Sequence, residues 1–161
     1  MSRRMRNGLL VVGLSLGLAL APTSAASAHG GDHHSAEVTR GSFVTLSGGT
    51  PYLLQGHAVM VRVGDRTMVG VHIRGLDGST VYPTHVHNKP CAAPDFGGSH
   101  YQHQVGGDVD ALNEIWATVR TNDRGNGLGF AAHAYRARSE AMSIVIHQAG
   151  TNTRLACADL S

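Results

Sequence analysis

The chain has 161 residues, with 13 Lys and Arg, 11 Asp and Glu, and 11 His. Three of the arginines lie in residues 1–28, which contain no acid, so residues 29–161 carry ten basic and eleven acidic side chains and a net charge of about −1 with His neutral. A net charge this close to zero does not provide the basic surface that binding to a nucleic acid requires. The 133 residues that follow position 28 suffice for one domain with one core.

Residues 1–28 have the pattern of an export signal. Arg3, Arg4 and Arg6 give a basic start, followed by the apolar run LLVVGLSLGLALA and by ASA before His29. The apolar run is too short to span a bilayer comfortably. We therefore expect cleavage before His29 and a secreted, extracytoplasmic protein whose mature form has no membrane span; the general secretory and twin-arginine routes both stay open.

Residues 29–41 follow the signal with the sequence HGGDHHSAEVTRG, which is polar and has no hydrophobic period. This composition predicts a flexible, His-rich N-terminal arm. Its histidines, His29, His33 and His34, could collect copper, although a tail that only keeps the chain soluble is the simpler account.

Residues 42–161 consist of short segments with an apolar period of two, separated by Gly, Asp and Asn turns. No segment has the caps and period of a helix. The sequence therefore predicts one all-β domain, a sandwich or barrel of antiparallel strands. The expected strands are residues 42–46, 57–63, 67–76, 114–121, 129–137 and 142–148.

Cys91 and Cys157 are the two cysteines of the chain. In an exported protein two lone cysteines usually pair, and a thiolate pair that binds metal is the alternative. We predict the disulfide, which would close a loop of about 66 residues and restrict the unfolded chain by about 4 kcal/mol.

The segment YPTHVHNKPC places His85 and His87 one residue apart at the end of an expected strand. Residues i and i+2 of a strand point to the same side, about 6 to 7 Å apart, so both imidazoles could reach one ion; two polar residues on a solvent face are the alternative. His100, in a glycine-rich connection, and His147, at another strand end, could turn toward the same point. Imidazoles without a thiolate suit Cu(II) or Zn(II), and a tetragonal nitrogen set favours copper.

Several of these segments, taken in order through residues 42–160, resemble motifs of the copper/zinc superoxide dismutase family. They are LQGHAVMVRV, VHIRGL, THVH, GGSH, VIH and TRLAC. The resemblance implies a Greek-key β-barrel or sandwich with a Cys91–Cys157 disulfide, and with Arg154 beside the metal to orient the superoxide anion. It also implies that copper is bound by His85, His87, His100 and His147.

The activity that the resemblance implies is the conversion of superoxide to dioxygen and hydrogen peroxide, as the copper cycles between Cu(II) and Cu(I). A non-catalytic module that binds or stores copper on the same fold is the alternative. Arg154 favours the enzyme, because storage needs no arginine for a substrate anion. The sequence does not indicate an oligomeric state.

In two features the sequence differs from the zinc-containing members of the family and resembles the copper-only branch. Members that bind zinc carry two further histidines and an aspartate, whereas here only His103 follows His100 closely. Asp108 or Asp110 could supply an oxygen ligand, but no complete set is visible, so zinc is doubtful. The second departure is that residues 148–153, QAGTNT, are too few to form the family's electrostatic loop.

Glu114 begins the expected strand EIWATVRT. The copper-only branch has a glutamate in this region that contacts the third copper histidine. The resemblance therefore implies that Glu114 orients His100 in place of zinc, and an exposed acid at a strand end is the alternative. Trp116 and Tyr135 are interpreted as packing residues.

Overall fold

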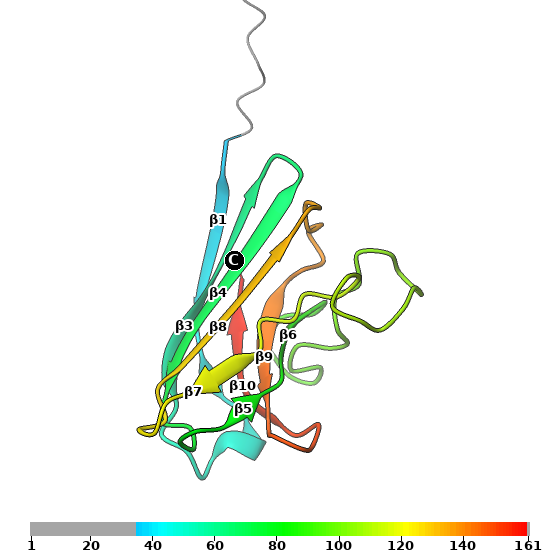
Figure 1. The fold of residues 1–161 in the computed structure, drawn as a ribbon. Helices are drawn as coiled ribbons and strands as arrows, with labels where there is room; N and C mark the ends of the chain where they lie inside the picture. Colours follow the sequence, from blue (N-terminus) through cyan, green and yellow to red (C-terminus); the bar gives the residue numbers. More distant parts are fainter. Residues whose placement is uncertain (1–34, 161) are drawn as a thin grey trace, which may run out of the picture. The chain divides into compact units, whose positions relative to one another are not determined.

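The computed structural model describes residues 35–160 (Figure 1). The export signal predicted for residues 1–28, and residues 29–34 of the predicted arm, lie outside the described residues. The elements are β1 (Glu37–Ser42), β2 (Val44–Thr45), the 3-10 helix η1 (Ser47–Gly49), β3 (Gln55–Val63), β4 (Arg66–Arg74), β5 (Val81–Tyr82), β6 (Thr84–His87), β7 (Val119–Thr121), β8 (Gly127–His133), β9 (Ser143–His147) and β10 (Arg154–Asp159).

The strands form two antiparallel sheets. One has six strands in the order β1-β3-β4-β8-β7-β5, and the other has four in the order β2-β10-β9-β6. The two sheets pack face to face as a sandwich, with the six-stranded sheet toward the viewer in Figure 1. The predicted all-β fold is therefore confirmed. Within the described residues, no helix has the length and apolar character that crossing a membrane requires.

The core lies between the sheets and follows the period of two. Along β3 and β4 every second side chain is buried, as at Met60 and Val69. Strand β9 is buried on both faces, because the segment after β6 covers the outer side of its sheet. There Val145 packs with Cys91 and Cys157 in a second, small cluster. Strand β9 is thus held rigidly where it ends at a histidine.

The structure joins Cys91 and Cys157 in a disulfide, as predicted, with Cα atoms 5.7 Å apart. The bond ties the segment after β6 to the middle of β10. Nearby, the Cys91 backbone N–H donates to Asp159 Oδ1 at 2.7 Å, and Ser143 Oγ donates to the Lys89 carbonyl at 2.7 Å. These contacts fix the segment against the four-stranded sheet.

Several predicted boundaries differ from the structure: the expected strand 129–137 is observed as β8, Gly127–His133, and the expected strand 42–46 is divided between β1 and β2. Residues 37–41, predicted as the end of the flexible arm, belong to β1, which pairs with β3 from Glu37↔Arg62 to Ser42↔His57. This edge strand has no apolar alternation in its sequence. Backbone hydrogen bonds to β3 make it a strand. Only residues 119–121 of the expected strand 114–121 form a regular strand; before them the chain makes isolated bridges at Glu114 and Trp116.

Candidate metal centre

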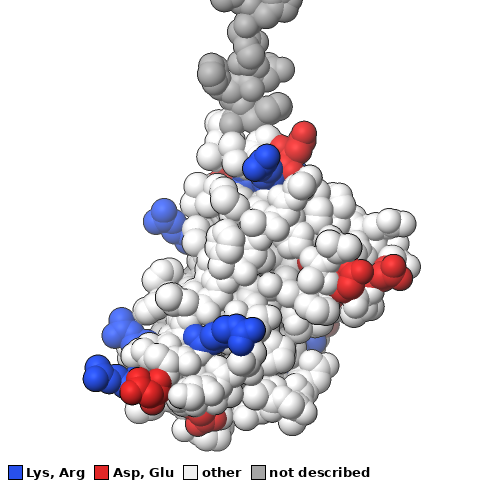
Figure 2. All heavy atoms as spheres, viewed as in Figure 1, with Lys and Arg blue, Asp and Glu red and all other residues white. Residues whose placement is uncertain are grey.

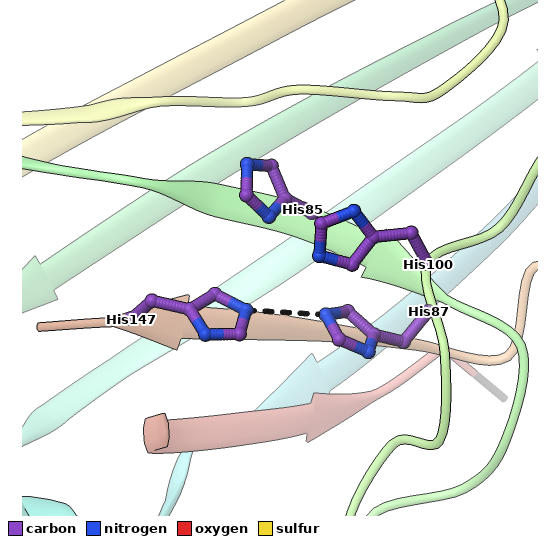
Figure 3. A group of neighbouring side chains, drawn as sticks. All are labelled: His85, His87, His100 and His147. Carbon is purple, nitrogen blue, oxygen red and sulfur yellow. Dashed lines mark hydrogen bonds between the residues drawn. The ribbon is translucent and has the colours of Figure 1, made fainter. Parts of the chain in front are cut away.

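Four histidines meet at one edge of the four-stranded sheet (Figure 3). His85 and His87 lie on β6, His147 ends the neighbouring strand β9, and His100 reaches the group from the connection after β6 through a bridge with His87. One ring nitrogen from each of the four lies within 4.8 Å of all the others. The strand period therefore brings together the two histidines of the HVH segment, as the sequence predicts.

Three of the four rings are oriented through Nδ1, which donates a hydrogen bond to an oxygen. The acceptors are the Gly98 carbonyl for His87 at 3.1 Å, Glu114 Oε2 for His100 at 2.7 Å, and the Asn152 carbonyl for His147 at 3.3 Å. Because these oxygens accept, the hydrogen of each neutral ring is on Nδ1 and the Nε2 lone pair is left for another partner.

The Nε2 atoms of His87 and His147 face each other 3.2 Å apart (Figure 3). With both hydrogens on Nδ1, two lone pairs point into the same space, an arrangement that a shared cation stabilises. Nitrogens 3.2 Å apart can both lie about 2.0 Å from one ion. His85 adds a second sign, because its Nδ1 is buried and has no hydrogen-bond partner. The donor set therefore fits a metal ion that prefers imidazole, and it is consistent with copper.

Burial lowers the pKa of three of these imidazoles, those of His85, His87 and His147. Loss of solvation, followed by the proximity of His100, lowers the pKa of His85 to about 3 and that of His87 to about 2. The pKa of His147 is also lowered, chiefly by burial. Neutral imidazole is the form that binds metal, so these three histidines do not need to lose a proton at neutral pH.

Glu114 lies beneath His100 and is only 2% exposed, so it is not an exposed strand-end acid. Its Oε2 accepts from His100 Nδ1 at 2.7 Å and from Trp116 Nε1 at 2.8 Å. The backbone of this segment is extended, which puts residues 114 and 116 on the same side. Trp116, interpreted from the sequence as a packing residue, thus also holds the carboxylate, and its spacing from Glu114 was the signal for this contact.

Arg154 begins β10 opposite His147 and lines the same open hollow of about 470 Å³ as His87, His100 and His147. Its guanidinium donates to three carbonyls of the covering segment, those of Asp95, Phe96 and Gly98, at 2.7, 3.0 and 2.6 Å. The positive charge of Arg154 contributes to the lowered pKa of His87 and of His147. The sequence pointed to this arginine only through the TRLAC motif, and gave no sign of its carbonyl contacts.

The Gly98 carbonyl accepts from both Arg154 and His87, so the turn at Gly97 and Gly98 determines two parts of the site. Both glycines have positive φ, +103° and +71°, and a Cβ on Gly98 would lie 2.4 Å from Lys89 Cγ. Only glycine adopts this conformation without strain. The GGSH motif is therefore explained by backbone geometry as well as by the histidine that ends it.

The residues considered for zinc have other contacts. The His103 ring stacks on Tyr135 with centroids 3.9 Å apart, and Asp110 Oδ1 accepts from the backbone N–H groups of Leu112 and Asn113, both at 2.9 Å. Within the part of the chain that the structure describes, Asp108 belongs to no cluster of potential metal ligands. Among residues 35–160, the four histidines are the one cluster of three or more potential metal ligands.

Arg138 is a further contributor that the sequence did not reveal. Its guanidinium donates to the carbonyls of Gln102, at 3.0 Å, and His103, and it lies over the Tyr101 ring at 5.3 Å. It thereby holds the segment that directly follows His100.

Comparisons with known proteins support the fold. A scan against protein-family models and a search of curated proteins find no match to this chain. Among solved structures the chain is similar to the Cu/Zn superoxide dismutase from Brucella abortus, with 16% sequence identity and a TM-score of 0.56 over 78% of this chain and 100% of that chain. The chain has a superoxide dismutase-like fold. At this identity the likeness establishes the fold alone.

Proposed function

We propose that this protein is an exported superoxide dismutase that works with copper bound by His85, His87, His100 and His147. The observation that carries the proposal is the pair of unsatisfied features in the four-histidine cluster: the facing Nε2 atoms of His87 and His147, and the buried Nδ1 of His85, which has no hydrogen-bond partner. When bound, copper would supply the one-electron chemistry, alternating between Cu(II) and Cu(I), so that two superoxide ions and two protons give one dioxygen and one hydrogen peroxide.

The chain's own contribution is to hold the ligands and to attract the substrate. Each ring anchored through Nδ1 presents Nε2 at a fixed angle, which reduces the reorganisation needed on binding. Arg154 places a fixed positive charge in the hollow that the three histidines share. A guanidinium presents several N–H donors to a small oxyanion, so Arg154 both attracts superoxide and orients it.

We propose further that copper works without zinc. A bridging zinc would fix the second nitrogen of a copper ligand, and here a buried carboxylate, Glu114, accepts from that nitrogen of His100. His103 and Asp110 make contacts elsewhere. Glu114 thus orients the His100 ring, as a bridging zinc ion would.

Export is also part of the proposal. The export pattern of residues 1–28 and the disulfide between Cys91 and Cys157 both agree with an oxidising compartment outside the cytoplasm.

The test is the rate of superoxide consumption by the copper-loaded protein, compared with its Arg154→Ala and Arg154→Lys variants. Arg124→Ala serves as a charge control, because Arg124 lies in the turn between β7 and β8. We expect Arg154→Ala to lower kcat/KM by about 10-fold or more while copper stays bound, and the lysine variant to recover part of the loss because the charge returns. An inactive copper-loaded protein would favour the storage module, and equal effects of Arg154→Ala and Arg124→Ala would remove the role given to Arg154.

A further inference from the structure

The outer face of the six-stranded sheet carries a broad apolar area. Strand alternation turns one set of side chains away from the core, and many of them are apolar although solvent-facing: Val38, Val59, Val61, Met68, Leu128, Phe130 and Ala132. Leu128 and Phe130 are each 67% exposed, and Val38 is 47% exposed. A sheet face that is exposed to water normally carries polar residues at these positions, so this area is a candidate contact surface.

The area also contains a hollow. Gly70 occupies an outward position in the middle of β4, and it lines a hollow of about 540 Å³ that His57, His72, Leu128 and Phe130 also border. The hollow lies on the opposite sheet from the four histidines of the metal centre. It can receive an apolar group inserted between the side chains.

Four arginines surround the apolar area: Arg40 on β1, Arg66 and Arg74 at the two ends of β4, and Arg120 on β7. Within residues 35–160, none of their side chains makes a hydrogen bond or an ion pair. No Asp or Glu occupies an outward strand position of this sheet. Figure 2 shows the same side of the molecule, with a wide uncharged area, basic groups spaced around it and acidic groups toward the margins.

The charge pattern of this face indicates which kind of partner binds to it. A second copy packed face to face would oppose arginine to arginine around an apolar centre, and such like-charge juxtaposition disfavours association. The surface of an anionic bilayer offers the complement, because its phosphates can meet the free guanidinium groups while Leu128 and Phe130 enter between the lipids.

We propose that the outer face of the six-stranded sheet binds the surface of an anionic lipid bilayer. The arginines provide the attraction, and the apolar centre with its hollow provides the insertion. This face is remote from the histidine site, so the proposal stands independently of the proposed enzymatic activity.

The test is cosedimentation of the exported protein with vesicles of phosphatidylcholine, with and without phosphatidylglycerol, over a series of salt concentrations. We expect sedimentation only with the anionic vesicles, and its loss as salt rises. Arg120→Ser should lower partitioning about fivefold, the equivalent of about 1 kcal/mol for one arginine near an anionic surface. Leu128→Thr together with Phe130→Thr should lower it about tenfold or more, because two largely exposed apolar side chains no longer insert.

Matched controls come from exposed residues away from this face. Val105→Thr with Leu112→Thr removes two apolar side chains that are 81% and 82% exposed, and Lys89→Ser removes one positive charge. Circular dichroism shows that each variant is folded, and the controls should sediment as the parent protein does. No sedimentation with anionic vesicles, or equal losses in test and control variants, would overturn the proposal. So would a dimer in analytical ultracentrifugation that the Leu128→Thr, Phe130→Thr variant abolishes.

Discussion

Replacing Glu114 with glutamine tests how the metal centre is oriented. The glutamine has nearly the same size, but its amide has one oxygen where the carboxylate has two. In the native site one carboxylate oxygen accepts from His100 at 2.7 Å and from Trp116 at 2.8 Å, at a position only 2% exposed. A glutamine can turn its amide NH₂ toward these donors, which leaves them without an acceptor. If it turns its amide oxygen toward them instead, the acceptor no longer carries a charge. Both outcomes weaken the contact with His100.

The expected size follows from these contacts. A hydrogen bond to a charged group contributes about 1.5 to 3 kcal/mol, so Glu114→Gln should lower the free energy of unfolding of the metal-free protein by about 2 kcal/mol. Loss of a partner that orients a metal ligand weakens metal affinity by about 10-fold to 100-fold. Chelator competition measures the copper affinity, and urea unfolding of the metal-free protein measures the stability.

Trp116→Phe is the matched control for this prediction. It removes the second donor to the same carboxylate and leaves the contact between Glu114 and His100 in place. We expect a comparable loss of stability, with copper affinity within about threefold of the parent protein. If both variants lowered copper affinity equally, Glu114 would act by general packing, and if neither did, His100 would not depend on the carboxylate.

Three further predictions concern the rest of the site. Cys91→Ser with Cys157→Ser should lower the free energy of unfolding by about 4 kcal/mol in urea titrations and weaken copper binding, and an unchanged copper affinity would show that the covering segment holds its shape without the bond. Metal analysis after reconstitution with both ions should find one copper and no tightly held zinc per chain; stoichiometric zinc would return His103 to consideration as a ligand. The metal-free protein should lose stability as pH falls below about 6.5, because the unfolded chain takes up protons there while the pKa values of His85 and His87 in the fold are about 3 and about 2. Urea midpoints that do not change between pH 7.5 and pH 5 would contradict this.

The parts of the site that lie on regular strands were predictable from the sequence. His85 and His87 share a side because the strand period is two, and His147 lies beside them because β6 pairs with β9. The anchors of the rings were not predictable in the same way. Gly98 and Asn152 contribute backbone carbonyls, which any residue possesses, so only the path of the connecting segments determines which of them reaches a ring.

The edge strand β1 shows the same limit. Its residues, EVTRGS, have no apolar alternation, and pairing with β3 makes them a strand. The outer face of the sheet is a different case, because its apolar residues follow the strand period but face solvent. The apolar period of two therefore indicates a strand and does not say which of its faces is covered. The four arginines around the apolar area become part of one surface only because β1, β4 and β7 lie in one sheet.

The measurement that tests the central claim most directly is the number of superoxide ions consumed per copper after a pulse of superoxide, with the copper-loaded protein present in catalytic amounts. The proposed function predicts that decay continues over many turnovers, at a rate proportional to the concentration of copper-loaded protein, and that dioxygen and hydrogen peroxide form in equal amounts. Consumption that stops after about one superoxide per copper, with copper still held by the four histidines, would contradict it and would make this protein a copper-binding module.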